Sequence, residues 1–194
     1  MSSFPDPALT ELILYACPVG TLADQLDVYF AESRRQFGAN TAHHYMPHCT
    51  LTGFFHDRPA AIGSYLSELN NLLPPIAPTP AAPVITITQM CLASGFHRLE
   101  LESSWLLQMV GEFFRTAGLL RPSSTRPDLI RPKKLLHLSL AYEYPPEQEA
   151  GLRALAEALI DPGASVGWVV RFYEHHPDNQ WTCHAEWPLS SPDI

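Results

Sequence analysis

The chain has 194 residues, of which 46% are hydrophobic, and a formal net charge of −8 at pH 7. A chain of this length buries enough apolar surface to fold without a disulfide or a metal, as one domain or two closely packed lobes. The negative charge argues against broad binding of duplex DNA, which depends on neutralising phosphates, and no apolar run approaches the roughly 20 residues that span a membrane.

The first half of the chain predicts two strands, each followed by a helix. A strand is expected over residues 11–19, and after it a helix that Thr21 caps and Gly38 terminates. A second strand is expected over residues 45–55, and Pro59 fits the first turn of a second helix.

A proline-rich segment, residues 74–83, divides the chain. Its five prolines exclude a helix or a central strand. We therefore expect an extended crossover between two lobes, residues 1–83 and 84–194, that belong to one domain.

The second half predicts the same alternation of strands and helices, closed by a hairpin. Its expected elements are strands over 84–92 and 96–102, a helix that Ser103 or Ser104 caps and that ends at Gly118, a strand over 135–144, a helix from Pro145 to Ile160, and strands over 166–174 and 181–187. The order indicates an internal duplication and an α+β fold, with antiparallel sheets backed by helices.

A short phrase occurs once in each half. His48 stands two residues before Thr50, and His137 stands two residues before Ser139. Side chains alternate between the two faces of a strand, so His48, Thr50 and Thr52 are expected on one face. His137 and Ser139 likewise share a face. Two such strands side by side would offer two imidazoles and at least two hydroxyls to one phosphate.

A metal site is the main competing interpretation of these histidines. His44 and His48 have the spacing of helical zinc ligands. However, Pro47 disfavours a helix at the residue before it, and the following run is strand-like. We therefore expect no metal and no cofactor.

Residues 119–134 form a basic segment in an acidic protein. They contain five basic residues and one acidic residue, and Lys133 lies close before His137. The segment is either a solvated loop or a rim that attracts phosphate.

The two phrases resemble the paired signatures of the two-histidine (2H) phosphoesterases, and most of all the cyclic phosphodiesterase and 2′-5′ RNA ligase-like branch. The residues that carry the resemblance are Met46-Pro47-His48-Cys49-Thr50-Leu51-Thr52-Gly53 and Leu136-His137-Leu138-Ser139-Leu140-Ala141-Tyr142. The resemblance implies two similar α+β lobes around a central groove, possible strand exchange between the lobes, His48 and His137 as catalytic residues, and Thr50 and Ser139 as phosphate-binding residues.

The function expected from this resemblance is metal-independent hydrolysis of a cyclic phosphodiester. The substrate would be the 2′,3′-cyclic or ADP-ribose 1″,2″-cyclic phosphate of a small nucleotide or an RNA end. One histidine would act as general base and the other as general acid, in an order that the sequence leaves open. The alternatives are a 2′-5′ or 3′-end RNA phosphodiesterase or exonuclease, and a non-catalytic nucleotide-binding domain.

Further substrate contacts are expected around the two motifs. Thr52 and Lys133 are candidates for polar contacts, and Phe54, Tyr142 and Trp181 are candidates for stacking on a base, unless they belong to the core. Four scattered cysteines without a Cys-x-x-Cys pair and the lack of a signal-peptide pattern predict a cytoplasmic protein. We expect it to be a monomer that binds neither duplex DNA nor a membrane.

Overall fold

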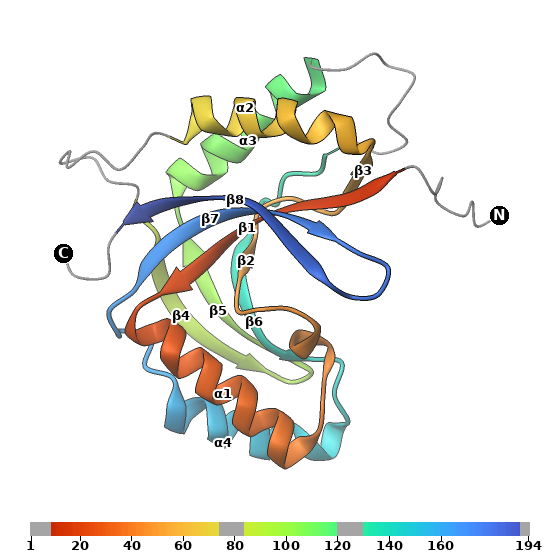
Figure 1. The fold of residues 1–194 in the computed structure, drawn as a ribbon. Helices are drawn as coiled ribbons and strands as arrows, with labels where there is room; N and C mark the ends of the chain where they lie inside the picture. Colours follow the sequence, from red (N-terminus) through yellow and green to blue (C-terminus); the bar gives the residue numbers. More distant parts are fainter. Residues whose placement is uncertain (1–8, 74–83, 120–129, 191–194) are drawn as a thin grey trace.

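The structure, a computed structural model, describes residues 9–73, 84–119 and 130–190. Its described part contains an eight-stranded antiparallel sheet and four α-helices (Figure 1), which confirms the predicted α+β class. The strand order is β4-β5-β6-β2-β1-β7-β8, and β3 pairs with β1. The strands are β1 (Thr10–Val19), β2 (Cys49–Thr50), β3 (Phe55–Asp57), β4 (Thr86–Ala93), β5 (Phe96–Glu102), β6 (Leu136–Tyr142), β7 (Gly167–His175) and β8 (Trp181–Ser190).

The helices follow the predicted order. They are α1 (Thr21–Phe37), α2 (Ile62–Leu72), α3 (Ser104–Leu119) and α4 (Glu149–Leu159), with short 3₁₀ turns η1 (Thr41–His44), η2 (Pro59–Ala61) and η3 (Pro146–Gln148). Ser103 caps α3, because its hydroxyl accepts from the backbone N–H of Leu106 at 3.3 Å. The prediction that Thr21 caps α1 is wrong: Gly20 is the N-cap residue, without a side-chain cap, and Thr21 is the first helical residue.

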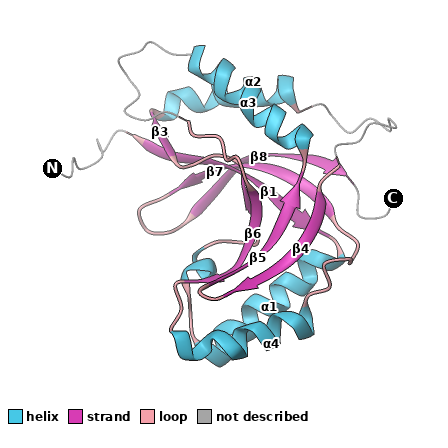
Figure 2. Cartoon of the chain, turned by 180° about the vertical axis from the view of Figure 1, so that it is seen from behind, coloured by secondary structure: helices cyan, strands magenta, loops and turns pink. Residues whose placement is uncertain are grey.

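Helices from the two halves of the chain pack in pairs. Helix α1 lies against α4 and α2 lies against α3, at opposite ends of the curved sheet (Figure 2). One apolar cluster joins side chains of all four helices to alternate residues of β1, including Leu12 and Leu14. The intervening residues Ile13 and Tyr15 point to the opposite face, where they form a separate cluster with Tyr173.

The C-terminal hairpin completes the sheet beside an N-terminal strand. Strand β7 pairs with β1 along its whole length, from Glu11 opposite His175 to Val19 opposite Gly167. The proline-rich segment 74–83 lies outside the described residues, and the division of the chain at that segment stays a prediction. No helix in the described ranges is both long and apolar enough to cross a membrane.

The predicted strand over residues 45–55 is wrong in its extent. Residues 45–48 follow the 3₁₀ turn η1, whose backbone Asn40 caps, and are not strand; within the predicted range only Cys49–Thr50 and Phe55, where β3 begins, are strand. Between them the hydroxyl of Thr52 accepts from the backbone N–H of Leu14 at 3.1 Å. A side chain therefore takes the place of a ladder carbonyl and interrupts the strand.

Candidate functional site

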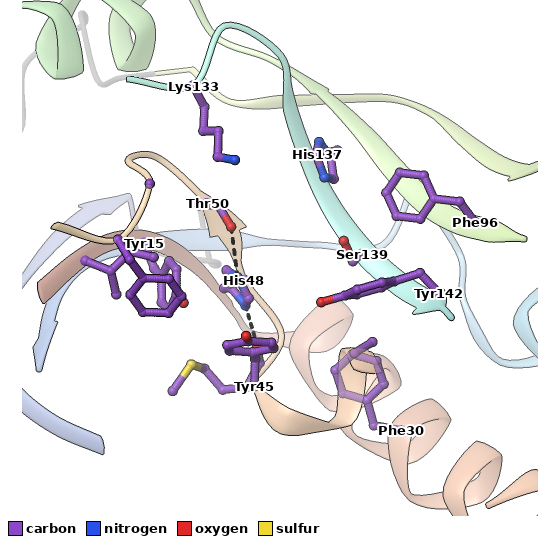
Figure 3. Close-up of a pocket in the computed structure, with 15 residues that line it drawn as sticks. Tyr15, Phe30, Tyr45, His48, Thr50, Phe96, Lys133, His137, Ser139 and Tyr142 are labelled. Atoms are coloured by element: carbon purple, nitrogen blue, oxygen red, sulfur yellow. Dashed lines mark hydrogen bonds between the residues drawn. The ribbon is translucent and has the colours of Figure 1, made fainter. Parts of the chain in front are cut away.

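The two motifs meet at the centre of the sheet. Cys49 of β2 pairs with Leu138 of β6, and both side chains are buried on the helix-covered face. The residues on either side of these two line a cavity of about 410 Å³ on the other face of the sheet (Figure 3). They are His48 and Thr50 around Cys49, and His137 and Ser139 around Leu138. The structure thus brings together the four side chains that the alternation rule placed on strand faces.

His48 has a defined tautomer. Its Nδ1 lies 2.7 Å from the backbone oxygen of Met46, and because a carbonyl only accepts, Nδ1 carries the proton. Nε2 of the neutral ring is then the acceptor, and the hydroxyl of Thr50 donates to it at 3.0 Å. The ring of Tyr15 covers His48, with ring centroids 3.9 Å apart. Burial lowers the pKa of His48 to about 4. The neighbouring His137 also lowers this pKa, whereas the hydrogen bond to Met46 raises it.

His137 lies among charged groups. Its pKa is lowered, most strongly by burial and further by the positive charges of Arg98 and Lys133. A hydrogen bond to the backbone of Leu135 and the carboxylate of Glu100 act in the opposite direction. Each motif histidine is thus hydrogen-bonded to the backbone of the residue two positions before it, which is Met46 for His48 and Leu135 for His137.

Lys133 lies at the cavity because its segment pairs with the first motif. Its backbone N–H donates to the oxygen of Leu51 at 2.9 Å, and the N–H of Gly53 donates to the oxygen of Arg131 at 2.8 Å. The side chain of Lys133 lines the cavity. Of the predicted basic segment, residues 120–129, with Arg121 and Arg126, lie outside the described residues.

Two of the predicted contacts line the cavity through their rings. Phe54 and Tyr142 are both lining residues. Burial raises the pKa of Tyr142 to about 12, so its phenol stays protonated, and its hydroxyl points toward the two motifs (Figure 3). Tyr142 can therefore donate a hydrogen bond as well as stack.

Two other predicted contacts do not line the cavity. Thr52 is fully buried and binds the backbone of Leu14, so it has a structural role instead of facing substrate. Trp181 lies behind the cavity wall, with ring centroids 5.7 Å from Tyr45 and 6.2 Å from Phe54. It supports lining rings without being among the lining residues.

The sequence prediction missed four aromatic lining residues, namely Tyr15, Phe30, Tyr45 and Phe96. Alternation along residues 11–19 and 96–102 provides the signal for Tyr15 and Phe96, but only once the neighbouring strands are known. Tyr45 and Phe30 come from a turn and a helix, and nothing in their local sequence marks them as lining residues.

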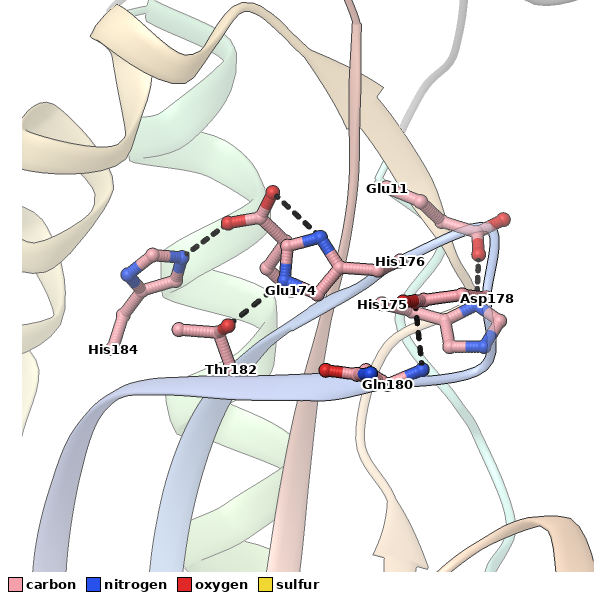
Figure 4. Close-up of polar contacts among 8 residues, drawn as sticks. All are labelled: Glu11, Glu174, His175, His176, Asp178, Gln180, Thr182 and His184. Atoms are coloured by element: carbon pink, nitrogen blue, oxygen red, sulfur yellow. Dashed lines mark hydrogen bonds and ion pairs between the residues drawn. The ribbon is translucent and has the colours of Figure 1, made fainter.

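A network of histidines and carboxylates holds the hairpin behind this wall (Figure 4). Nδ1 of His175 lies 2.6 Å from a carboxylate oxygen of Glu11, and the centroid of the His175 ring lies 4.4 Å from that of Trp181. On the next strand Nε2 of His184 lies 2.8 Å from Glu174. Within residues 9–73, 84–119 and 130–190, no group of three or more His, Cys, Asp or Glu side chains is arranged to hold a metal ion.

Comparison with known proteins finds similar segments in much longer chains. No family model matches the chain. It is 29% identical to the ecdysteroid-phosphate phosphatase of Drosophila melanogaster over 86% of its own length and 26% of that protein. It is 28% identical to the ubiquitin-associated and SH3 domain-containing protein A of Mus musculus, over 88% of its own length and 27% of that protein. The ecdysteroid-phosphate phosphatase of Bombyx mori is 25% identical, with 86% and 25% covered. The chain thus spans about a quarter of each of these relatives.

Proposed function

We propose that this protein is a phosphoester hydrolase of the two-histidine type, and that it opens a cyclic phosphodiester. The observation that carries the proposal is the matched pair of motifs in one cavity: each has a backbone-anchored histidine and a hydroxyl two residues later. Two histidines that flank a phosphate supply a base and an acid near neutral pH.

In this proposal His48 is the general base. Its Nδ1 proton is held by Met46, so the free lone pair is on Nε2, and its lowered pKa keeps the ring neutral. His48 takes a proton from water as the water oxygen bonds to phosphorus. Without substrate, the hydroxyl of Thr50 donates to this Nε2. When substrate enters, the hydroxyl turns and donates to the phosphate instead.

His137 is the general acid. It gives a proton to the ribose oxygen as the bond from phosphorus to that oxygen breaks, so a linear phosphomonoester is formed. Its protonated form is favoured by Glu100 and, once substrate is bound, by the negative phosphate itself. Ser139 and Lys133 contribute a hydrogen bond and a positive charge to the phosphate oxygens.

The relatives support only the coarser part of this proposal. Two of them are named as phosphatases of an ecdysteroid phosphate, and both are about four times as long as the segment that they share with this chain. Their names agree with chemistry at a phosphate ester. The cyclic diester is argued from the site and from the resemblance of the motifs.

A substrate panel tests the proposal. Nucleoside 2′,3′-cyclic phosphates, 3′,5′-cyclic nucleotides, short 2′-5′ and 3′-5′ oligonucleotides and phosphate monoesters are incubated with the protein and separated by chromatography. We expect opening of the 2′,3′-cyclic phosphates to monoesters, and its loss in the double variant His48→Ala with His137→Ala. Release of inorganic phosphate from monoesters alone, or binding of nucleotides without any turnover, would contradict the proposal.

A further inference from the structure

A second cavity adjoins the first one on the far side of His137. It has a volume of about 630 Å³ and shares two lining residues, Phe96 and His137, with the first cavity. Its remaining lining comes from β4, β5, the start of α3 and residues 134–136, and includes Arg98, Leu107 and Lys134. We call this second cavity the outer groove.

Consecutive lysines serve the two cavities. Lys133 lines the first cavity and Lys134 lines the outer groove. The chain bends at Lys134 and Leu135, just before β6, and the pair therefore contributes one positive charge to each of the two cavities that His137 lines. A phosphorus atom beside His137 would thus have a cation on either side of it.

Most of the other charge in the outer groove is already paired. Nε of Arg98 donates to Glu100 at 3.1 Å, and the side-chain amide of Gln89 also donates to Glu100. The carboxylate of Glu102 lines the groove as well. Lys134, by contrast, makes no ion pair with any of the described residues. Among the described residues that line this groove, Lys134 is therefore the cation available to an anionic ligand.

Large apolar side chains are exposed beside this lysine. Leu135 is 81% exposed and Leu107 is 39% exposed, and both line the outer groove. Exposed apolar groups that converge on a cavity with a few polar groups are typical of a ligand site. Aliphatic side chains next to Lys134 suit the flat face of a base with a phosphate attached.

We propose that the outer groove binds the second nucleoside of a linear internucleotide phosphodiester, with Lys134 contacting the phosphate that follows that nucleoside. This inference rests on the proposed function, because it assumes that the first phosphorus lies between His48 and His137. The two ester oxygens of a linear diester carry two different nucleosides, which diverge from phosphorus, whereas both ester oxygens of a cyclic phosphate belong to one ribose. The two cavities on either side of His137 provide room for both nucleosides.

Binding of adenosine ligands tests the inference without relying on turnover. Three probes are titrated into the full chain by calorimetry: AMP, the dinucleoside ApA, and ApAp, which carries an added 3′-terminal phosphate. The internal linkages are phosphorothioates, so that they resist cleavage. In the wild-type protein we expect ApA to bind more tightly than AMP, and ApAp to bind about tenfold more tightly than ApA, because of one charge-assisted contact.

Variants assign this gain to the outer groove. Lys134→Glu should remove the advantage of ApAp over ApA and leave AMP unchanged, while Lys134→Arg should retain it. Lys133→Glu, the adjacent substitution on the other side of His137, should weaken all three ligands. Arg115→Glu makes the same charge change at an exposed site of α3 that lines neither cavity, and it should change none of them.

The outcomes separate this inference from the proposed function. If ApA and AMP bind equally well to the wild-type protein, or if Lys134→Glu weakens AMP as much as ApAp, the outer groove is not a nucleoside site. Opening of cyclic phosphates would then still stand. If the ligands behave as expected and no cyclic phosphate is opened, the groove is supported and the proposed reaction is wrong.

Discussion

The two motif histidines occupy corresponding positions but have different neighbours. On β1, Tyr15 is the register partner of Thr50, and on β5, Arg98 is the register partner of Ser139. An aromatic ring therefore lies beside the first motif, and a guanidinium with its partner Glu100 lies beside the second. This difference, which the repeated sequence hides, is the physical basis for giving His48 and His137 opposite roles.

The first prediction concerns loss of either histidine. His48→Ala and His137→Ala should each lower the turnover of a cyclic phosphate by about 10²–10⁴-fold, because each removes one partner in proton transfer. Both side chains face the cavity, so the variants should still fold, which circular dichroism can check. A variant that keeps more than roughly a tenth of the wild-type rate would count against its role.

The second prediction concerns the pH dependence of kcat/KM, which reports the free protein. The base must be neutral, and burial lowers the pKa of His48 to about 4, so activity should persist well into the acidic range. The acid must be protonated, and the pKa of His137 is lowered, so activity should fall as pH rises through that value. We expect an optimum below about 6.5, the ordinary histidine pKa.

A substitution of Glu100 tests this assignment. Glu100→Gln removes the charge that favours protonated His137, so the alkaline limb should move to lower pH. Glu102→Gln, on the same strand but not among the groups that shift His137, should leave that limb in place. If the alkaline limb does not move in Glu100→Gln, His137 is not the general acid. If the acidic limb of the wild-type protein lies at about 6.5, His48 is not the general base with the lowered pKa.

At the scale of elements, the site depends on an interrupted strand. Residues 51–54 form an irregular connection between β2 and β3, in which the N–H groups of Leu51 and Thr52 both donate to the oxygen of Leu14. This connection places Phe54 at the cavity while Phe55 is buried in the core. Thr52 stabilises this connection, because its fully buried hydroxyl accepts a hydrogen bond from the backbone N–H of Leu14. The same residue that was predicted to contact substrate thus shapes the segment that does line the cavity.

The third prediction follows from this contact. Thr52→Val keeps the shape of the side chain but leaves the buried N–H of Leu14 without its side-chain acceptor, which should lower the free energy of unfolding by about 1–3 kcal/mol. Denaturant titration measures the change. Thr52→Ser, which retains the hydroxyl, should recover part of it, and Thr88→Val, at a hydroxyl in an exposed contact, should cost little. Equal stability of Thr52→Val and wild type would show that the hydrogen bond is dispensable.

At the scale of the whole molecule, helix packing joins the two ends of the chain. Helix α4 approaches α1 closely at Gly151, where a Cβ atom would lie 2.6 Å from ring atoms of Phe37. At Gly111 of α3 a Cβ atom would have no neighbour within 4 Å. Gly151 and Gly111 therefore differ in whether tertiary contact demands a glycine.

The fourth prediction compares these two positions by thermal and denaturant unfolding. Gly111→Ala should stabilise the protein by about 0.5–1 kcal/mol through helix propensity. Gly151→Ala gains the same propensity but overpacks the ring of Phe37, at a cost of about 1–3 kcal/mol, so it should destabilise the protein. In a Phe37→Leu background the penalty should shrink. Equal effects at both glycines would argue against the close packing of α1 on α4.

The sequence alone determined the class of the fold and the position of the two motifs. Period-two and helical patterns, with Pro and Gly as boundaries, predict elements from local preferences, and strand β5 was predicted with the bounds that the structure gives it. The alternation of side chains likewise fixed that His48 and Thr50, and His137 and Ser139, share a face. These inferences need only the geometry of one strand.

The tertiary structure alone decided which residues surround the motifs. Whether Thr52, Trp181, Tyr15 or Phe96 meets the cavity depends on strand neighbours and register, which arise from packing between segments far apart in the chain. The lowered pKa of His48 and the charged surroundings of His137 have the same origin, because burial and Coulomb interactions depend on distance in space and not on separation in sequence. Two similar motifs thereby acquire different chemistry.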